Sequence, residues 1–135
     1  MKANELMIGD WVMQFGEPRR IVGIRTDAFY PYIKTNMGDT WYEEGMKDLA
    51  EPIPLTPEIL EENGFISNKF NINDVFGTRF DLGNHYYLIF YNSNKGGSLT
   101  KYYTSQSGFY ITTIEYVHEL QHALRLCGIE KEIEV

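Results

Sequence analysis

The sequence has little cysteine, a deficit of positive charge and no long apolar run. Cys127 is the only cysteine in 135 residues, which excludes an intramolecular disulfide and a cysteine-based zinc cluster. The 12 basic residues are outnumbered by 19 acidic ones, and the formal net charge is −7. Because nucleic-acid affinity comes largely from Lys and Arg contacts to phosphates, nucleic acid is an unfavourable partner.

The chain also lacks any apolar stretch that approaches the length of a membrane span. Residues 1–6 read MKANEL and contain no apolar core of a secretory signal. We therefore expect a cytoplasmic protein that does not contact a membrane.

Aromatic residues, by contrast, are plentiful. Hydrophobic residues make up 43% of the chain and aromatic residues 15%, with ten Tyr and eight Phe. This apolar content suffices for a packed core and argues against disorder. Tyr and Phe favour strands, so we expect a protein rich in β-structure.

The N-terminal part, residues 1–51, carries the pattern of a small barrel. Short apolar segments at residues 8–13, 19–24, 29–35 and 40–42 alternate with turns that contain Gly. Several short strands with Gly-rich turns are typical of small antiparallel barrels. The pattern predicts an SH3-like β-barrel.

The remainder, residues 52–135, predicts an antiparallel sheet with one or two packed helices. Pro52 and Pro54 stiffen a linker, and a helix over 57–63 follows, with Thr56 as its N-cap and Gly64 at its end. Strand patterns occupy residues 66–114. A second helix is expected over 114–126 and a final strand over 129–135. The predicted fold class is therefore α+β.

One segment, His118-Glu119-Leu120-Gln121-His122, matches the H-E-x-x-H pattern of zinc hydrolases. On a helix both imidazoles share a face and could bind one metal ion, while Glu119 acts as a base. A catalytic zinc site needs a third protein ligand, but Arg125 and Gly128 stand where the extended pattern has Gly and His.

The helical phase also disfavours a zinc site. One apolar stripe should face the sheet, and it consists of Ile114, Val117, Leu120, Leu124 and Cys127. His118 and His122 then point toward solvent unless another element covers them, whereas a protease site needs a cleft. We expect no metal, no cofactor and no catalytic residue, and we keep the zinc-dependent hydrolase as an alternative.

Two other candidates are binding surfaces. Trp11, Arg19, Arg20 and Trp41 could form a site for single-stranded nucleic acid or peptide on the barrel. Alternatively, the Trp rings fill the barrel core. The six tyrosines of the predicted sheet could stack on sugars, bases or a partner surface, or instead pack under the second helix and pair across strands; they are Tyr86, Tyr87, Tyr91, Tyr102, Tyr103 and Tyr110.

Three segments of the chain carry a family resemblance. Residues 1–12 read MKANELMIGDWV, residues 53–60 read IPLTPEIL, and residues 116–121 read YVHELQ. They resemble the start, middle and C-terminal helix of short uncharacterised proteins from Bacteroides-type gut bacteria and their phages. The family pattern Y-V-H-x-L-Q requires neither Glu119 nor His122.

The resemblance implies a phage or mobile-element context and supplies no activity or catalytic residue. Together with the residue patterns, it favours a non-enzymatic binding or accessory protein whose partner is another protein.

Overall fold

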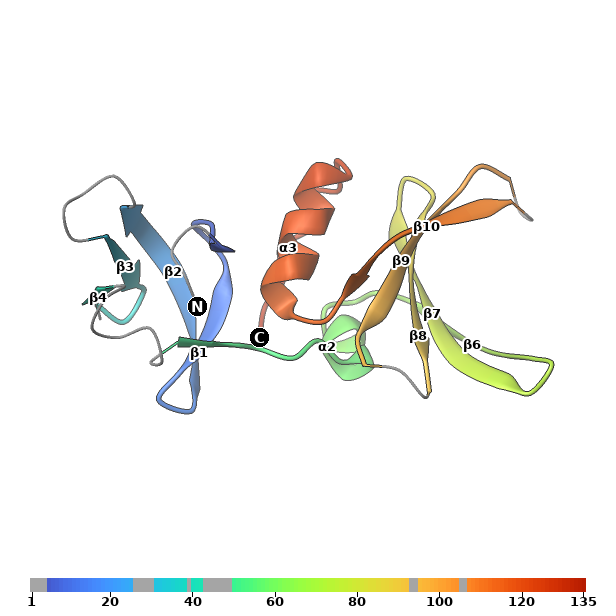
Figure 1. Ribbon diagram of the computed structural model, residues 1–135, viewed down its shortest axis with the longest axis horizontal. Coiled ribbons are helices and arrows are strands. Elements are labelled where there is room, and N and C mark those ends of the chain that lie inside the picture. The colour runs from blue at the N-terminus through green and yellow to red at the C-terminus, as the bar shows by residue number, and fades with distance from the viewer. Residues whose placement is uncertain (1–4, 26–30, 39, 43–49, 93–94, 105–106) are drawn as a thin grey trace. The chain divides into compact units, whose positions relative to one another are not determined.

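The structure is a computed structural model, and it describes residues 5–25, 31–38, 40–42, 50–92, 95–104 and 107–135. The chain is a mixed α+β protein of two compact units, Met1–Ile53 with Val135 and Pro54–Glu134. Each unit contains one five-stranded antiparallel sheet among its described residues (Figure 1). The division falls within residues 51–54, where two prolines occur.

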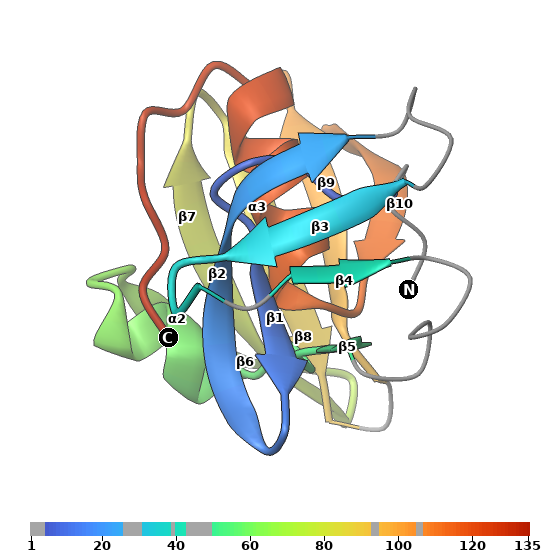
Figure 2. The ribbon, with the colours of Figure 1, turned by 90° about the vertical axis from the view of Figure 1, so that its left-hand side faces the viewer.

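The sheet of the N-terminal unit has the strand order β4-β3-β2-β1-β5 (Figure 2). Its strands are β1 (Trp11–Gln14), β2 (Glu17–Arg25), β3 (Tyr32–Thr35), β4 (Thr40–Tyr42) and β5 (Ala50–Pro52). The tight turn between β1 and β2 uses left-handed conformations at Phe15 and Gly16, which suit the twist of a two-residue hairpin. The core contains Leu6, Val12, Ile21, Ile33 and Ala50.

The sheet of the second unit is a meander with the order β10-β9-β8-β7-β6. Its strands are β6 (Ser67–Ile72), β7 (Val75–Gly83), β8 (Tyr86–Tyr91), β9 (Gly97–Tyr102) and β10 (Gly108–Ile114). Phe80, Leu88 and Leu99 are cross-strand partners and are all buried. This row of side chains marks the face of the sheet that α3 (Val117–Leu126) covers (Figure 1).

The helix α2 (Pro57–Glu62) confirms the predicted first helix. The Oγ1 atom of Thr56 accepts a hydrogen bond from the backbone N–H of Ile59 at 3.4 Å, and Gly64 adopts a left-handed conformation just past the helix end. Leu60 is the buried residue of this short helix.

Two predicted elements differ from the structure, and one observed strand was not predicted. The second helix begins at Val117 rather than at residue 114, because Ile114 still pairs with Gly97 in the sheet. The final strand is wrong, since residues 129–135 form no regular element. Instead, the side chain of Asn63 donates to the carbonyl of Glu134 and accepts from its N–H, at 2.9 and 2.8 Å. Strand β5 occurs where the sequence indicated the end of the barrel and the start of the linker.

Candidate functional site

The segment that matches the zinc pattern lies in the first half of α3. The rings of His118 and His122 meet edge to face, with centroids 5.7 Å apart, and the His118 ring stacks on Tyr116 at 5.9 Å. His118 is only 8% exposed, so its imidazole is covered by other residues and does not face solvent. The buried arc of α3 is wider than its apolar stripe and includes the polar residues His118 and Gln121.

A metal site needs further ligands beside these two histidines. Within the part of the chain that the structure describes, no group of three or more His, Cys, Asp and Glu side chains is placed to hold a metal ion. A hydrolytic zinc needs three protein ligands and an open position for water. Among the described residues, His118 and His122 therefore have no third side chain that could complete such a site.

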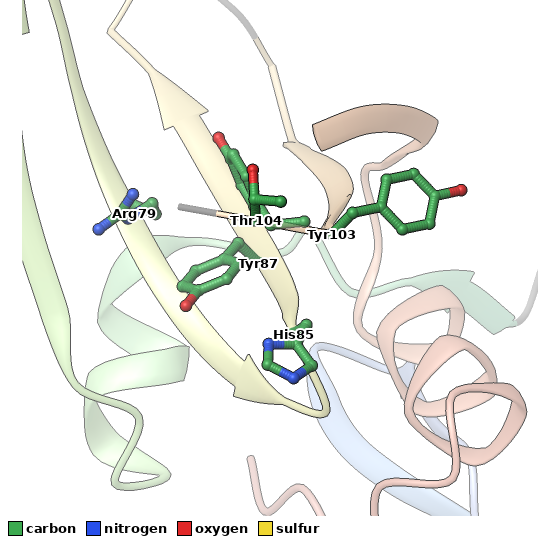
Figure 3. A pocket seen from close by; sticks show the side chains of 6 residues that line it. Arg79, His85, Tyr87, Tyr103 and Thr104 are labelled. Atoms are coloured by element: carbon green, nitrogen blue, oxygen red, sulfur yellow. The ribbon is translucent and has the colours of Figure 1, made fainter. Parts of the chain in front are cut away.

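The tyrosines divide between the two faces of the second sheet. Tyr86 faces α3, whereas Tyr102 and Tyr87 (Figure 3) lie on the opposite face. Tyr87 and Tyr102 meet edge to face at 5.2 Å. Tyr103 points away from Tyr87 (Figure 3). Its ring stacks on Phe109 at a centroid distance of 5.1 Å. One face thus packs under the helix, and the other keeps half-buried rings in cross-strand contact.

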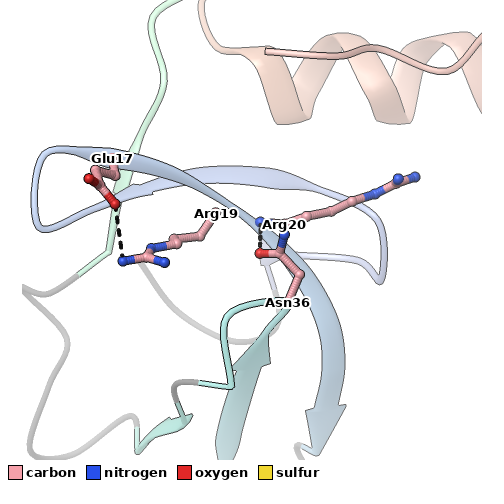
Figure 4. Close-up of polar contacts among 4 residues, drawn as sticks. All are labelled: Glu17, Arg19, Arg20 and Asn36. Atoms are coloured by element: carbon pink, nitrogen blue, oxygen red, sulfur yellow. Dashed lines mark hydrogen bonds and ion pairs between the residues drawn. The ribbon is translucent and has the colours of Figure 1, made fainter.

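The basic pair of the N-terminal unit does not form one patch. The Arg19 and Arg20 side chains extend in different directions from β2, and the Arg19 guanidinium pairs with the Glu17 carboxylate at 3.3 Å (Figure 4). The backbone N–H of Arg20 donates to the Oδ1 atom of Asn36 at 3.0 Å. Trp11 is 9% exposed, and the side chain of Trp41 lies outside the described residues. The Trp11 ring therefore offers little surface on which a base could stack.

A groove of about 410 Å³ lies between α3 and the sheet. The strands contribute the side chains of Tyr86, Leu99, Ile111, Thr112 and Ile114. The helix contributes those of Glu119, His122, Ala123, Leu126 and Cys127. The groove is thus mainly apolar, with a few polar groups from the helix.

Glu119 gives the groove its electrostatic character. Partial burial raises the pKa of its carboxyl above the ordinary value, and the neighbouring charge of Glu115 raises it further. Backbone hydrogen bonds and the nearby His122 act in the opposite direction with smaller effect. A carboxylate that is short of solvation next to a second carboxylate attracts a cationic group.

Cys127 lies in the same groove. Burial raises the pKa of its thiol, while a hydrogen bond with Tyr86 and the charge of Lys101 partly offset that shift. The Lys101 ammonium in turn lies over the Tyr86 ring, 4.7 Å from its centroid. The thiol is therefore protonated near neutral pH and is a poor nucleophile.

Strand β10 forms one wall of the groove and is an edge of the sheet. Its seven residues, GFYITTI, carry no charge, and all but Ile114 are exposed. The register against β9 shifts between Tyr110 and Thr112, which identifies Ile111 as the extra residue of a bulge. Bulges re-aim side chains, and this one places Ile111 on the rim of the groove.

The only sequence signal for the groove beside β10 is the uncharged run at residues 108–114. No periodicity could indicate that α3 lies beside this particular strand. Ile111 and Leu126 line the same groove only because the tertiary structure brings the strand and the helix together. The sequence therefore could not predict that they share a site.

No protein-family model, curated protein or solved structure matches this chain. None of the helices among the described residues is long and apolar enough to cross a membrane.

Proposed function

We propose that this protein is a non-enzymatic binding protein that takes up an extended peptide segment of a partner protein by strand addition to β10. The observation that supports this proposal is that an uncharged, exposed edge strand also forms a wall of an apolar groove. A peptide that pairs with such an edge gains main-chain hydrogen bonds, and its alternate side chains enter the neighbouring groove.

The two edges of the sheet differ in the way that this proposal requires. Edge strands normally avoid unwanted pairing through charged residues, especially Lys. Strand β6, the opposite edge, carries the charged residue Lys69, and its neighbour Asn68 is polar. Strand β10 has no charged residue, and only its bulge interrupts the pairing surface. Its outward backbone groups have no backbone partner among the described residues.

The groove indicates which peptide is preferred. Ile111, Ala123 and Leu126 offer apolar surface to one inserted side chain. Glu119, with Glu115 beside it, favours a Lys or Arg near that anchor. The net charge of −7 adds a general attraction for basic segments. The expected ligand is an extended peptide with an apolar anchor and a neighbouring basic residue.

A displayed library of random peptides, selected on the full chain, tests the proposal. We expect enrichment of peptides with an apolar residue next to Lys or Arg. Ile111→Lys and Leu126→Lys place charges on the groove rim. Each should lower the affinity for the selected peptides by about tenfold or more. Alkylation of Cys127 by iodoacetamide should slow when such a peptide is bound, because the thiol lies in the groove.

Matched controls lie at the opposite edge of the sheet. Ile72 and Val75 are exposed apolar residues of β6 and β7, and Ile72→Lys and Val75→Lys should leave peptide affinity unchanged. Equal losses in both sets of variants, or the absence of any enriched peptide, would contradict the proposal. Circular dichroism of each variant separates loss of binding from loss of fold.

We further infer that the N-terminal unit is a small SH3-like barrel. Its five antiparallel strands form one sheet, and β1, β2, β3 and β5 each contribute a side chain to one apolar core. The register of β2 against β3 shifts between Ile21 and Gly23. Bulges of this kind bend a strand and help a small sheet to curve. Closure of that sheet in an experimental structure would test the inference.

A further inference from the structure

A second pocket lies on the face of the sheet opposite α3. It has a volume of about 280 Å³, and its lining includes Arg79, His85, Tyr87 and Tyr102 (Figure 3). The Arg79 guanidinium lies 5.0 Å from the centroid of the Tyr87 ring. Such stacking orients a guanidinium while it leaves the N–H groups free for a ligand.

The described lining of this pocket is basic, whereas the chain as a whole is acidic. The chain has 19 acidic residues, yet none of the described residues that line the pocket carries a carboxylate. Asp81 lies two residues from Arg79 on β7, and its Oδ1 atom accepts a hydrogen bond from the Gly83 N–H at 2.9 Å. Arg79 itself forms no ion pair with any described residue. An arginine without a counter-ion, beside an imidazole, is suited to an anion.

The polar groups of the pocket are held in place by the sheet. Arg79 and Tyr87 stand on the neighbouring inner strands β7 and β8. His85 occupies a left-handed turn position, and its carbonyl accepts a hydrogen bond from the Tyr102 N–H at 3.0 Å. The preceding Asn84 donates to the Cys127 carbonyl at 3.1 Å, which ties the turn to the end of α3. Groups fixed in this way lose little freedom when a ligand binds.

Hydrogen-bonding capacity remains available. The hydroxyl groups of Tyr87 and Tyr102 have no hydrogen-bond partner among the described residues, although both side chains are half-buried. Arg presents a fork of donors that matches a phosphate group, and the hydroxyls and the imidazole add further donors. The aromatic rings offer surface to a flat group.

We propose that this pocket binds a small phosphate monoester carried on a flat ring, an aryl or a nucleoside phosphate. Arg79 binds the phosphate, and the Tyr87 and Tyr102 side chains contact the ring and its polar atoms. The volume of the pocket is at the lower end for ligand sites, so a ligand with one ring system is the appropriate size. This site is separate from the peptide groove, which lies on the other face.

Isothermal titration of the full chain with phenyl phosphate, adenosine monophosphate, inorganic phosphate and phenol tests the proposal. Phenyl phosphate or adenosine monophosphate should bind at least about tenfold more tightly than inorganic phosphate or phenol, because only they supply both ring and charge. Preference for phenyl phosphate indicates an aryl phosphate, and preference for adenosine monophosphate indicates a nucleotide.

Variants locate the binding. Arg79→Gln and Tyr87→Leu should each reduce affinity about tenfold or more. Lys69→Gln removes the same charge from an exposed residue of the same sheet and should leave the affinity for the ring phosphate unchanged. Ile111→Lys, which tests the peptide groove, should also leave phosphate binding intact, so the two proposals fail independently. Absence of saturable binding by either ring phosphate, or equal binding by Arg79→Gln and the native chain, would overturn the proposal.

Discussion

At the scale of single residues, Glu119 combines two opposing demands. Its position in the first turn of α3 suits a negative charge, because the helix N-terminus is electropositive. Its partial burial beside Glu115 disfavours that charge, and the balance raises the pKa of the carboxyl from its ordinary value of 4.5. The folded protein therefore holds this proton more tightly than the unfolded chain does.

The consequence for stability has a defined sign. A raised pKa means that the ionised carboxylate destabilises the folded state above that pKa, and that this cost disappears as the pH falls below the unfolded value. The Glu119→Gln variant should therefore gain free energy of unfolding relative to the native protein as the pH rises from about 4 to 7. Urea unfolding at several pH values measures this, with the exposed Glu130→Gln as control. A stability difference between variant and native protein that does not change with pH would contradict the raised pKa of Glu119.

At the scale of elements, α3 contains a matched pair of leucines on different sides. Leu124 is 1% exposed and belongs to the buried stripe, whereas Leu126, two residues later, is 89% exposed at the groove rim. Leu124→Ala should lower the free energy of unfolding by about 2–4 kcal/mol through lost burial and an unfilled cavity. Leu126→Ala should change it by less than about 0.5 kcal/mol. Chemical denaturation of both variants measures the contrast, and comparable losses would show that the helix packs differently.

The elements that the sequence predicted well are those with local signals. The bounds of α2 follow from Thr56, Pro57 and Gly64, each of which acts within one helical turn of its position. Strand β5 has no such signal, because Ala50 becomes a strand only by pairing with Gln14 in a distant part of the chain. The sequence did not predict the burial of His118, because a helical phase derived from apolar residues does not indicate which polar side chains are buried.

At the scale of the whole molecule, each unit has its own sheet and its own buried residues. The second unit includes both helices of the described chain and a core that contains Phe80, Leu88, Leu99, Leu120 and Leu124. A unit with a complete apolar core is expected to fold independently.

Residues 54–134 expressed alone should therefore unfold cooperatively and should still bind the selected peptides and the ring phosphate. Thermal unfolding followed by circular dichroism measures the first property, and titration measures the second. A fragment without a cooperative transition would show that the second unit depends on residues 1–53.

The meander order of the second sheet has a kinetic consequence. Every strand from β6 to β10 pairs with its immediate neighbour in the sequence, so each pairing closes only a short loop. Short loops cost little chain entropy, and local pairings correlate with fast folding. During synthesis the five strands emerge before α3, and the sheet face that carries Phe80, Leu88 and Leu99 stays uncovered until that helix has been made. This interval, rather than the finished fold, is when the chain is most exposed to aggregation and to capture by chaperones.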